Sequence, residues 1–188
     1  KPVLATKLAT IAMRESDQLT AIVSDFLDFA RKPRVRREMF DINGLAREVV
    51  DVTQHKYIQA TSLLIQGQFS ETTCPVSGDR TQIRKVFVNL AKNAIEAMNE
   101  KGTLQVAVVP SASYVEVRSD DEGPGIDPDK VARIFEPFYT TKAQGVAVGL
   151  AICMRIVTAH DGTIRAASRQ GGGASMTVRL PLVRTGEQ

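Results

Sequence analysis

Apolar residues recur at alternating spacings of four and three along the first thirty positions of the chain. The residues that set this spacing are Leu8, Ala12, Glu15, Leu19, Ile22, Phe26 and Phe29. The pattern predicts a long coiled-coil-like helix with one polar member in its seam. Because such a helix cannot bury its apolar face alone, it either pairs with another chain or has lost a neighbouring helix. Pro33 and the basic residues around it end the predicted helix.

A second unit begins near Asp41, where the pattern changes to short helical and strand-like segments. Asp41 is the predicted N-cap of a helix that runs to about Ala60. The apolar face of that helix carries Leu45, Val49 and Val52. Further helices are predicted at about 79–98 and 148–159, and strands around 63–69, 104–108, 115–117, 164–166 and 176–180.

Local signals mark where several of these elements begin. Asp79 and Gln82 have the spacing of a capping box, and Asp127-Pro128 reads as an N-cap followed by proline. About five strands and three main helices in mixed order predict an α+β fold. We expect a two-layer α/β sandwich, with a mixed five-stranded sheet and helices on one face. The predicted units are residues 1–37, a helix with a basic hinge, and residues 38–188, the sandwich.

Composition sets the broad class of the chain. Its 188 residues are 43% hydrophobic and 24% charged, which is typical of a globular protein. The longest nearly apolar stretch, Val146–Met154, is far shorter than the roughly 20 residues of a membrane helix. No signal peptide is visible, and Cys74 and Cys153 do not form a disulfide framework. We therefore expect a reduced, cytoplasmic domain whose longer parent carries any membrane anchor elsewhere.

The formal net charge of +3 is concentrated in one segment. The basic run consists of Arg31, Lys32, Arg34, Arg36 and Arg37. No aromatic residue is interleaved with it, and residues 41–188 carry no basic excess. This pattern favours a solvated hinge and argues against a nucleic-acid partner.

Two polar clusters in the second unit have the chemistry of a nucleotide site. Asn89 and Asn93 are four apart on one predicted helix and share a face. Their amide oxygens suit Mg²⁺ when phosphates supply the other oxygens. The segment Asp121–Gly125 follows a predicted strand, and an ionised Asp121 could accept a hydrogen bond from an exocyclic amine such as that of adenine. Taken singly, each cluster also fits an ordinary capping pair or polar turn.

Two further clusters could meet phosphate. In the segment Phe135–Lys142, Lys142 offers a point charge, and Thr140 and Thr141 offer hydroxyl donors. The next segment opens a predicted helix, whose N-terminal N–H groups can bind an anion. It consists of Gly145, Val146, Ala147, Val148, Gly149 and Leu150. Taken singly, these two clusters also fit a surface loop and a helix start without a ligand.

In order and spacing, the four clusters together resemble the ATP-binding catalytic domain of bacterial sensor histidine kinases. This domain belongs to the wider family of DNA gyrase, Hsp90 and MutL. Asn89–Ala94 resembles the asparagine box, Asp121–Gly125 the first glycine box and Phe135–Lys142 the phenylalanine box. Gly145–Leu150 stands where the second glycine box belongs. Residues 1–32 resemble the second helix of the dimerisation and phosphotransfer hairpin.

The resemblance implies a role for each matching position. Asn93 would bind Mg²⁺ with Asn89 nearby, and Asp121 would read the adenine amine in a pocket shaped by Gly123 and Gly125. Residues 138–149 would form a lid over ATP. The phosphate-binding side chains would be Lys142 and Lys92. An amide at position 89 cannot act as a general base, which favours transfer to a protein histidine over transfer to water. The implied partners are a second copy of the chain and the acceptor Asp of a response regulator.

The sequence departs from the family in two places. The chain has only His55 and His160, and neither has the acidic residue and proline that follow the family's acceptor histidine. We therefore expect a piece of a longer sensor that cannot autophosphorylate. The second glycine box has Val146 and Ala147 where the family has Thr and Gly. If that glycine needs a positive φ, Ala147 costs about 1 kcal/mol, so we expect nucleotide binding with weak phosphate contacts.

Two alternatives stay open at this point. One is a nucleotide-weak, pseudokinase-like module that dimerises and acts as a scaffold for a response regulator. The other is a different ATPase of the superfamily, such as an anti-sigma kinase. The predicted N-terminal helix and hinge argue against the second alternative.

Overall fold

The computed structural model describes the second unit almost completely. It covers residues 34–57, 62–137, 139 and 148–183, together with Ala9, Met13, Ser16, Thr20, Val23 and Leu27. These six N-terminal positions are helical, and the Thr20 hydroxyl donates to the Ser16 carbonyl oxygen at 2.9 Å. The predicted coiled-coil seam lies outside the described residues, so pairing through it stays a prediction.

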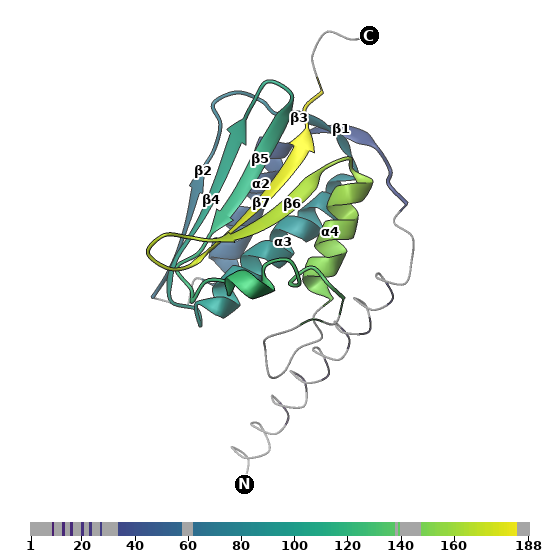
Figure 1. Cartoon of the computed structure of the whole chain (residues 1–188). Coiled ribbons are helices and arrows are strands. Elements are labelled where there is room, and N and C mark those ends of the chain that lie inside the picture. The colour runs from purple at the N-terminus through teal and green to yellow at the C-terminus, as the bar shows by residue number, and fades with distance from the viewer. Residues whose placement is uncertain are drawn as a thin grey trace.

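Five strands form one mixed sheet in the order β2-β4-β5-β7-β6 (Figure 1). Their bounds are β2 (Leu63–Gln68), β4 (Gly102–Pro110), β5 (Tyr114–Asp120), β6 (Thr163–Ser168) and β7 (Ala174–Pro181). β2 pairs with β4 in parallel, and all other neighbours are antiparallel. The predicted mixed five-stranded sheet is therefore confirmed.

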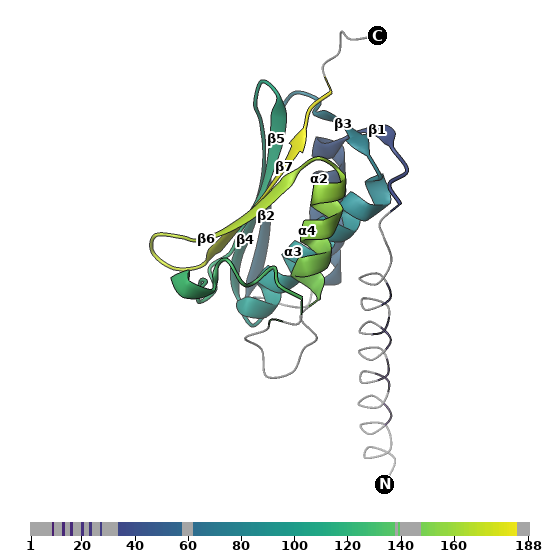
Figure 2. The ribbon, with the colours of Figure 1, turned by 45° about the vertical axis from the view of Figure 1, so that its right-hand side comes forward.

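Three helices cover one face of this sheet, as two views show (Figures 1 and 2). They are α2 (Ile42–Lys56), α3 (Arg80–Ala97) and α4 (Gly149–Ala159). Alternate strand residues such as Val115, Val117 and Val178 are buried in one core with α-helical residues such as Ile83. The two-layer α+β architecture is confirmed. Within the described ranges, no helix is both long and apolar enough to cross a membrane.

A second, two-stranded sheet was not predicted. It pairs β1 (Glu38–Asp41) with β3 (Pro75–Gly78) in antiparallel register. Four-residue strands contain too few alternations to stand out, and these two are separated by more than thirty residues. The small sheet matters because Asp41 ends β1 and Asp79 directly follows β3. Because the two strands are antiparallel, with Asp41 opposite Pro75 and Glu38 opposite Gly78, α2 and α3 start at opposite ends of this small sheet.

The start signals were confirmed, and the predicted ends of α3 and α4 lie within one residue of the observed ones. Asp41, Asp79 and Asp127 are N-caps whose side chains accept backbone N–H groups, for α2, α3 and the short 3₁₀ helix Pro128–Lys130 respectively. The predicted end of the first helix at Ala60 was wrong, because α2 ends at Lys56 and the Tyr57 N–H bonds to the Thr53 carbonyl oxygen.

Two single positions also differ from the prediction. Val52, expected on the buried face of α2, is 48% exposed. Phe69, expected on a strand, follows the end of β2 at Gln68. Its ring stacks instead against the Arg47 guanidinium, whose central carbon lies 4.4 Å from the ring centroid.

Candidate nucleotide site

Asn89 and Asn93 lie one turn apart on α3, beside its buried apolar residues Val86 and Leu90. Both asparagines are half-buried. The Nδ2 atom of Asn89 is fully buried, yet nothing in the described part of the chain accepts its hydrogen bond. This nitrogen faces α4, because a Cβ built on Gly149 would stand 3.8 Å from it. A buried donor without a partner costs about 1–3 kcal/mol, so a ligand acceptor here would be stabilising.

Asp121 follows β5 and is held by backbone donors. Its side chain is buried, with only 4% of the residue exposed. Oδ1 accepts from the Gly123 N–H at 2.8 Å and from the Ala174 N–H at 3.1 Å. Among the described residues, no donor bonds to Oδ2. The carboxylate therefore has a fixed orientation and one oxygen left to accept a bond from a ligand.

The two glycines of the first glycine box are required by close contacts. A Cβ on Gly123 would lie 2.9 Å from Asp121 Oδ1 and 3.4 Å from the Ala97 Cβ. Gly125 has a φ of +78°, and a Cβ there would lie 3.1 Å from the Gly173 carbonyl oxygen. The loop can therefore approach both the last turn of α3 and the β6–β7 turn only without side chains.

Helix α3 thus aligns the two halves of the site. Gly149 lies against Asn89, Gly123 lies against Ala97, and Asn93 is midway between them. Eight residues of α-helix span about 12 Å. The site therefore has a carboxylate end and an end at the start of α4, with Asn93 between the two.

The first backbone N–H groups of α4 have no acceptor among the residues that the structure describes. Val148 is its N-cap and provides no side-chain hydrogen bond, and the first turn has no acidic residue. Val148 is buried, and Leu150 packs against the core. Packing fixes this helix end while its first N–H groups stay available to an anion.

Several predicted phosphate ligands cannot be placed. Outside the described residues lie Thr140, Thr141, Lys142, Gly145, Val146 and Ala147. Before this segment, Phe135 packs against the core, as expected for an anchor. Lys92 is exposed on α3, and its Nζ lies 3.7 Å from Glu96 Oε1. The predicted contact of Lys92 with phosphate would have to replace this weak surface pair.

His160 has a structural role, at the opposite end of α3. It is buried, and its Nε2 accepts from the Asp79 N–H at 2.8 Å while its Nδ1 lies 2.7 Å from the Ile156 carbonyl oxygen. Nδ1 must carry the proton, since Nε2 is an acceptor. His55 is exposed on the last turn of α2. The capping box is therefore half formed, because the Asp79 N–H binds His160 rather than the side chain of Gln82.

Two carboxylates near the hinge have lowered pKa values. Burial alone would raise the pKa of Asp79, but hydrogen bonds from Gln82 and from the Arg36 and Thr81 N–H groups outweigh it. The pKa of Glu48 is lowered by hydrogen bonds from Arg84 and then from Arg80. Both residues stabilise the start of α3 in their ionised form.

The donor set fits Mg²⁺ only together with a ligand. No cluster of three His, Cys, Asp or Glu side chains that could hold a metal occurs within the described ranges. Asn89 and Asn93 offer neutral oxygens that suit Mg²⁺, and the unpaired Nδ2 of Asn89 is a donor that suits a phosphate oxygen beside the metal. Mg²⁺ commonly binds through few protein ligands plus phosphates and water. The residues present therefore fit a phosphate-bound magnesium ion.

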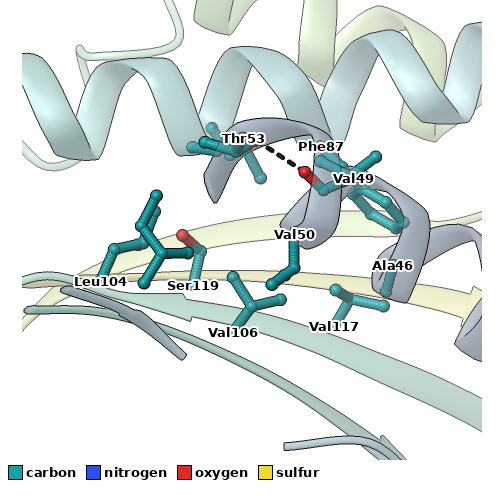
Figure 3. Close-up of a pocket in the computed structure, with 12 residues that line it drawn as sticks. Ala46, Val49, Val50, Thr53, Phe87, Leu104, Val106, Val117 and Ser119 are labelled. Atoms are coloured by element: carbon teal, nitrogen blue, oxygen red, sulfur yellow. Dashed lines mark hydrogen bonds between the residues drawn. The ribbon is translucent and has the colours of Figure 1, made fainter. Parts of the chain in front are cut away.

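A separate cavity of about 20 Å³ lies between α2, α3 and the sheet (Figure 3). Apolar side chains such as Val50, Leu104 and Val106 line it, and Thr53 at its edge donates to the Val49 carbonyl oxygen. Neither asparagine nor Asp121 lines it. It is a gap in the core rather than the nucleotide site.

Sequence reasoning missed the contribution of the β6–β7 turn. Ser168, Arg169 and Gly173 all contact the loop that begins at Asp121. The run of three glycines, 171–173, between two predicted strands was the available signal. It indicates a turn, but the contact across 48 residues depends on the order of the strands.

Comparison with known proteins identifies relatives of this domain. The family model described as histidine kinase-, DNA gyrase B-, and HSP90-like ATPase matches residues 78–184. Sporulation kinase C of Bacillus subtilis (strain 168) is 32% identical over 173 residues, which are 92% of this chain and 40% of the relative. The chain thus spans about two fifths of that protein, and 29% of a second relative, the signal transduction histidine-protein kinase AtoS of Escherichia coli (strain K12).

Two solved structures have the same fold over most of the chain. Full-length ShkA in complex with AMPPNP matches with a TM-score of 0.81 and 29% identity, covering 93% of this chain and 38% of that one. Histidine kinase ThkA in complex with the response regulator protein TrrA matches with a TM-score of 0.79 and 29% identity, covering 92% and 50%.

Proposed function

Because the chain belongs to the histidine kinase-, DNA gyrase B- and HSP90-like ATPase family, we propose that residues 38–188 bind ATP for phosphoryl transfer to a histidine. The observation that carries this proposal is the alignment along α3. Among the described residues, Asp121 Oδ2 accepts no hydrogen bond at one end, and the buried Nδ2 of Asn89 has no acceptor at the other. A nucleotide with its base at Asp121 and its phosphates at the start of α4 would satisfy both.

Each part of the site has a defined task in this proposal. Asp121 Oδ2 accepts a hydrogen bond from the adenine amine, and Asn93, assisted by Asn89, binds Mg²⁺. When bound, the metal neutralises phosphate charge. The N–H groups of Gly149 and Leu150 bind phosphate oxygens. Phosphoryl transfer depends mainly on such positioning and charge neutralisation.

The lid residues complete the phosphate site in this proposal. Lys142, Thr140 and Thr141 would contact the phosphates from above, with Lys92 as a further cation. Restoring the glycine in Ala147→Gly should then tighten ATP more than adenosine, because only ATP carries the phosphates that the second glycine box would contact. Equal effects on both ligands in a calorimetric titration would contradict this role of the lid.

The phosphoryl acceptor lies on another segment of a longer protein. His160 already uses both ring nitrogens, and His55 lies on the surface of α2. An amide at position 89 cannot activate water, which favours a protein acceptor. We therefore expect no autophosphorylation of this chain by itself, and label transfer from ATP to a supplied acceptor-helix peptide.

A response regulator and a second copy are the proposed partners. The likeness to ThkA, solved with a response regulator, supports the first. The predicted seam in residues 1–37 supports the second. Cys74 and Cys153 are both buried. A reduced, cytoplasmic compartment is part of the proposal. A scaffold without nucleotide binding is the weaker alternative, because it leaves the unpaired groups along α3 without a purpose.

Calorimetric titration with ATP and Mg²⁺ tests the proposal. We expect one-to-one binding that Asp121→Asn weakens by about 10- to 100-fold, since a hydrogen bond to a charged group is lost. Asp51→Asn, on the exposed surface of α2, is the matched control and should bind normally. Absence of binding at millimolar ATP would contradict the proposal and favour the scaffold.

A further inference from the structure

The turn between β6 and β7 contacts the loop of Asp121 at several points. Both segments lie at the same end of the sheet in two views (Figures 1 and 2). The Asp121 N–H donates to the Ala174 carbonyl oxygen at 2.9 Å, and the Ala174 N–H returns a bond to Asp121 Oδ1 at 3.1 Å. The turn thus holds both the backbone and the side chain of the residue proposed to read adenine.

Arg169 adds a side-chain contact to this pairing. Its Nη1 donates to the Asp121 carbonyl oxygen at 2.8 Å, and its backbone N–H donates to the Gly173 carbonyl oxygen at 3.0 Å. The residue is half-buried. Because a charged donor makes a stronger bond than a neutral one, Arg169 restricts rotation of the peptide group that follows Asp121.

Glycines make this approach sterically possible. Gly173 has a φ of +89°, and a Cβ there would lie 1.9 Å from the Asp121 carbonyl oxygen. Gly171 and Gly172 also have positive φ, but a Cβ on either would meet nothing within 4 Å. The close contact at Gly173 is therefore specific, whereas the other two glycines only shape the turn.

Ser168 holds the far end of the same loop. Its hydroxyl donates to the Ile126 carbonyl oxygen at 2.5 Å and accepts from the Ile126 N–H at 3.0 Å. The loop from Asp121 to Ile126 is thus fixed at both ends by consecutive residues of β6 and the turn. These loop contacts come in addition to the pairing of β5 with β7 over seven residues.

We propose that Arg169 is a positioning residue that fixes Asp121 so that the site selects a 6-aminopurine over a 6-oxopurine. The inference rests on the proposed binding of ATP at Asp121. With Oδ1 held by two N–H groups, Oδ2 presents lone pairs in one direction. A 6-amino group donates to it, whereas a 6-oxo group places oxygen against oxygen. Without Arg169 the peptide group after Asp121 loses a restraint, so the Gly123 N–H holds Oδ1 less firmly and the preference declines.

The test compares binding of ATP and ITP by Arg169→Met, Arg169→Lys and the unsubstituted chain. Arg169→Met should lower the ATP-to-ITP affinity ratio by about fivefold, mainly by weakening ATP, as expected for one lost hydrogen bond. Arg169→Lys should retain part of the preference for ATP over ITP. Arg165→Met, at an exposed arginine on β6 before the turn, is the matched control and should leave the ratio unchanged.

Hydrogen exchange separates this inference from the proposed function. In the nucleotide-free protein, Arg169→Met should speed exchange of the Gly123 and Ala174 N–H groups and leave the core strands unchanged. Equal weakening of ATP and ITP, or an unchanged ratio, would overturn the positioning role while ATP binding stands. If the unsubstituted chain binds neither nucleotide, the proposed function fails, and the selection by Arg169 fails with it.

Discussion

The two ends of helix α3 use polar side chains in opposite ways. At the hinge end, Asp79 accepts from the Gln82 N–H at 3.1 Å and from the Arg36 N–H at 3.3 Å, and its own N–H binds His160. Toward the other end, the buried amide nitrogen of Asn89 has no partner in the described part of the chain. Asp79 at the hinge end is thus bonded within the protein, whereas the Asn89 donor is left for a ligand.

The comparison shows which polar residues of α3 stabilise the fold and which are available to a ligand. Polar groups bonded to their own chain stabilise the fold, and groups left unpaired cost stability unless a ligand pairs them. An unpaired atom alone is not sufficient. Within the described ranges, Gln82 Oε1 and Ser119 Oγ are also buried without a partner, and Ser119 lines the core cavity. Asn89 differs because it faces the start of a helix.

The largest expected effect is at the hinge end. His160→Ala removes the acceptor of the Asp79 N–H and leaves a cavity, so it should lower the free energy of unfolding by about 3 kcal/mol. Denaturant unfolding measures the change. His55→Ala, at an exposed position, should alter the free energy by less than about 0.5 kcal/mol. Similar small losses for both variants would contradict the structural role of His160.

The contrast between two asparagines sharpens the comparison. Asn43 exchanges two hydrogen bonds with Ser70, at 2.8 and 3.0 Å, so Asn43→Ala should destabilise the fold by about 2 kcal/mol. Asn89→Ala removes an unpaired donor and should leave stability equal or raise it by up to about 1 kcal/mol. It should also weaken binding of ATP with Mg²⁺ by about tenfold. A stability loss at Asn89 as large as at Asn43 would show that its amide is paired.

The charges around Glu48 should produce a smaller, pH-dependent effect. The pKa of Glu48 in the folded protein lies below its ordinary value of 4.5. Its stabilisation is therefore complete above that pH and is lost as the pH falls through the lowered value. Because the pairs with Arg84 and Arg80 are partly exposed, Glu48→Gln should cost only about 0.5–1 kcal/mol at pH 7. Unfolding curves from pH 7 downward should show the full cost at pH 7 and a declining cost as the pH falls below 4.5.

The smallest expected effect concerns the hinge arginine. Arg37 Nη2 lies 2.6 Å from Asp161 Oδ2 and 3.4 Å from the Ala159 carbonyl oxygen, at the end of α4. Both side chains are exposed, so Arg37→Met should cost about 0.5 kcal/mol or less. Thermal unfolding at low and high salt would check it. A loss that persists in high salt would show that packing of the arginine stem matters more than its charge.

Local sequence patterns predicted the main helices, the strands of the larger sheet and the N-caps of this domain. They did not predict contacts between residues far apart in the sequence. Asp41, Asp79 and Asp127 were identified as N-caps because a cap depends only on the next few residues. The bond from Asp79 to His160 joins residues 81 apart, and that of Arg169 to Asp121 joins residues 48 apart. Such pairs require the strand order and helix packing. Asn89, Asn93 and Asp121 stood out because their spacing resembles a known family, whereas the roles of His160 and Arg169 became visible only in the fold.

The most direct test of the central claim is an NMR titration of the chain with ATP and Mg²⁺. The side-chain amide signals of Asn89 and Asn93 and the N–H signals of Gly123 and Gly149 should shift together and saturate at one equivalent of nucleotide. The N–H signal of Gln82 at the hinge end should stay in place. Shifts confined to the hinge end, or none at saturating nucleotide, would contradict the claim that the unpaired groups along α3 form the nucleotide site.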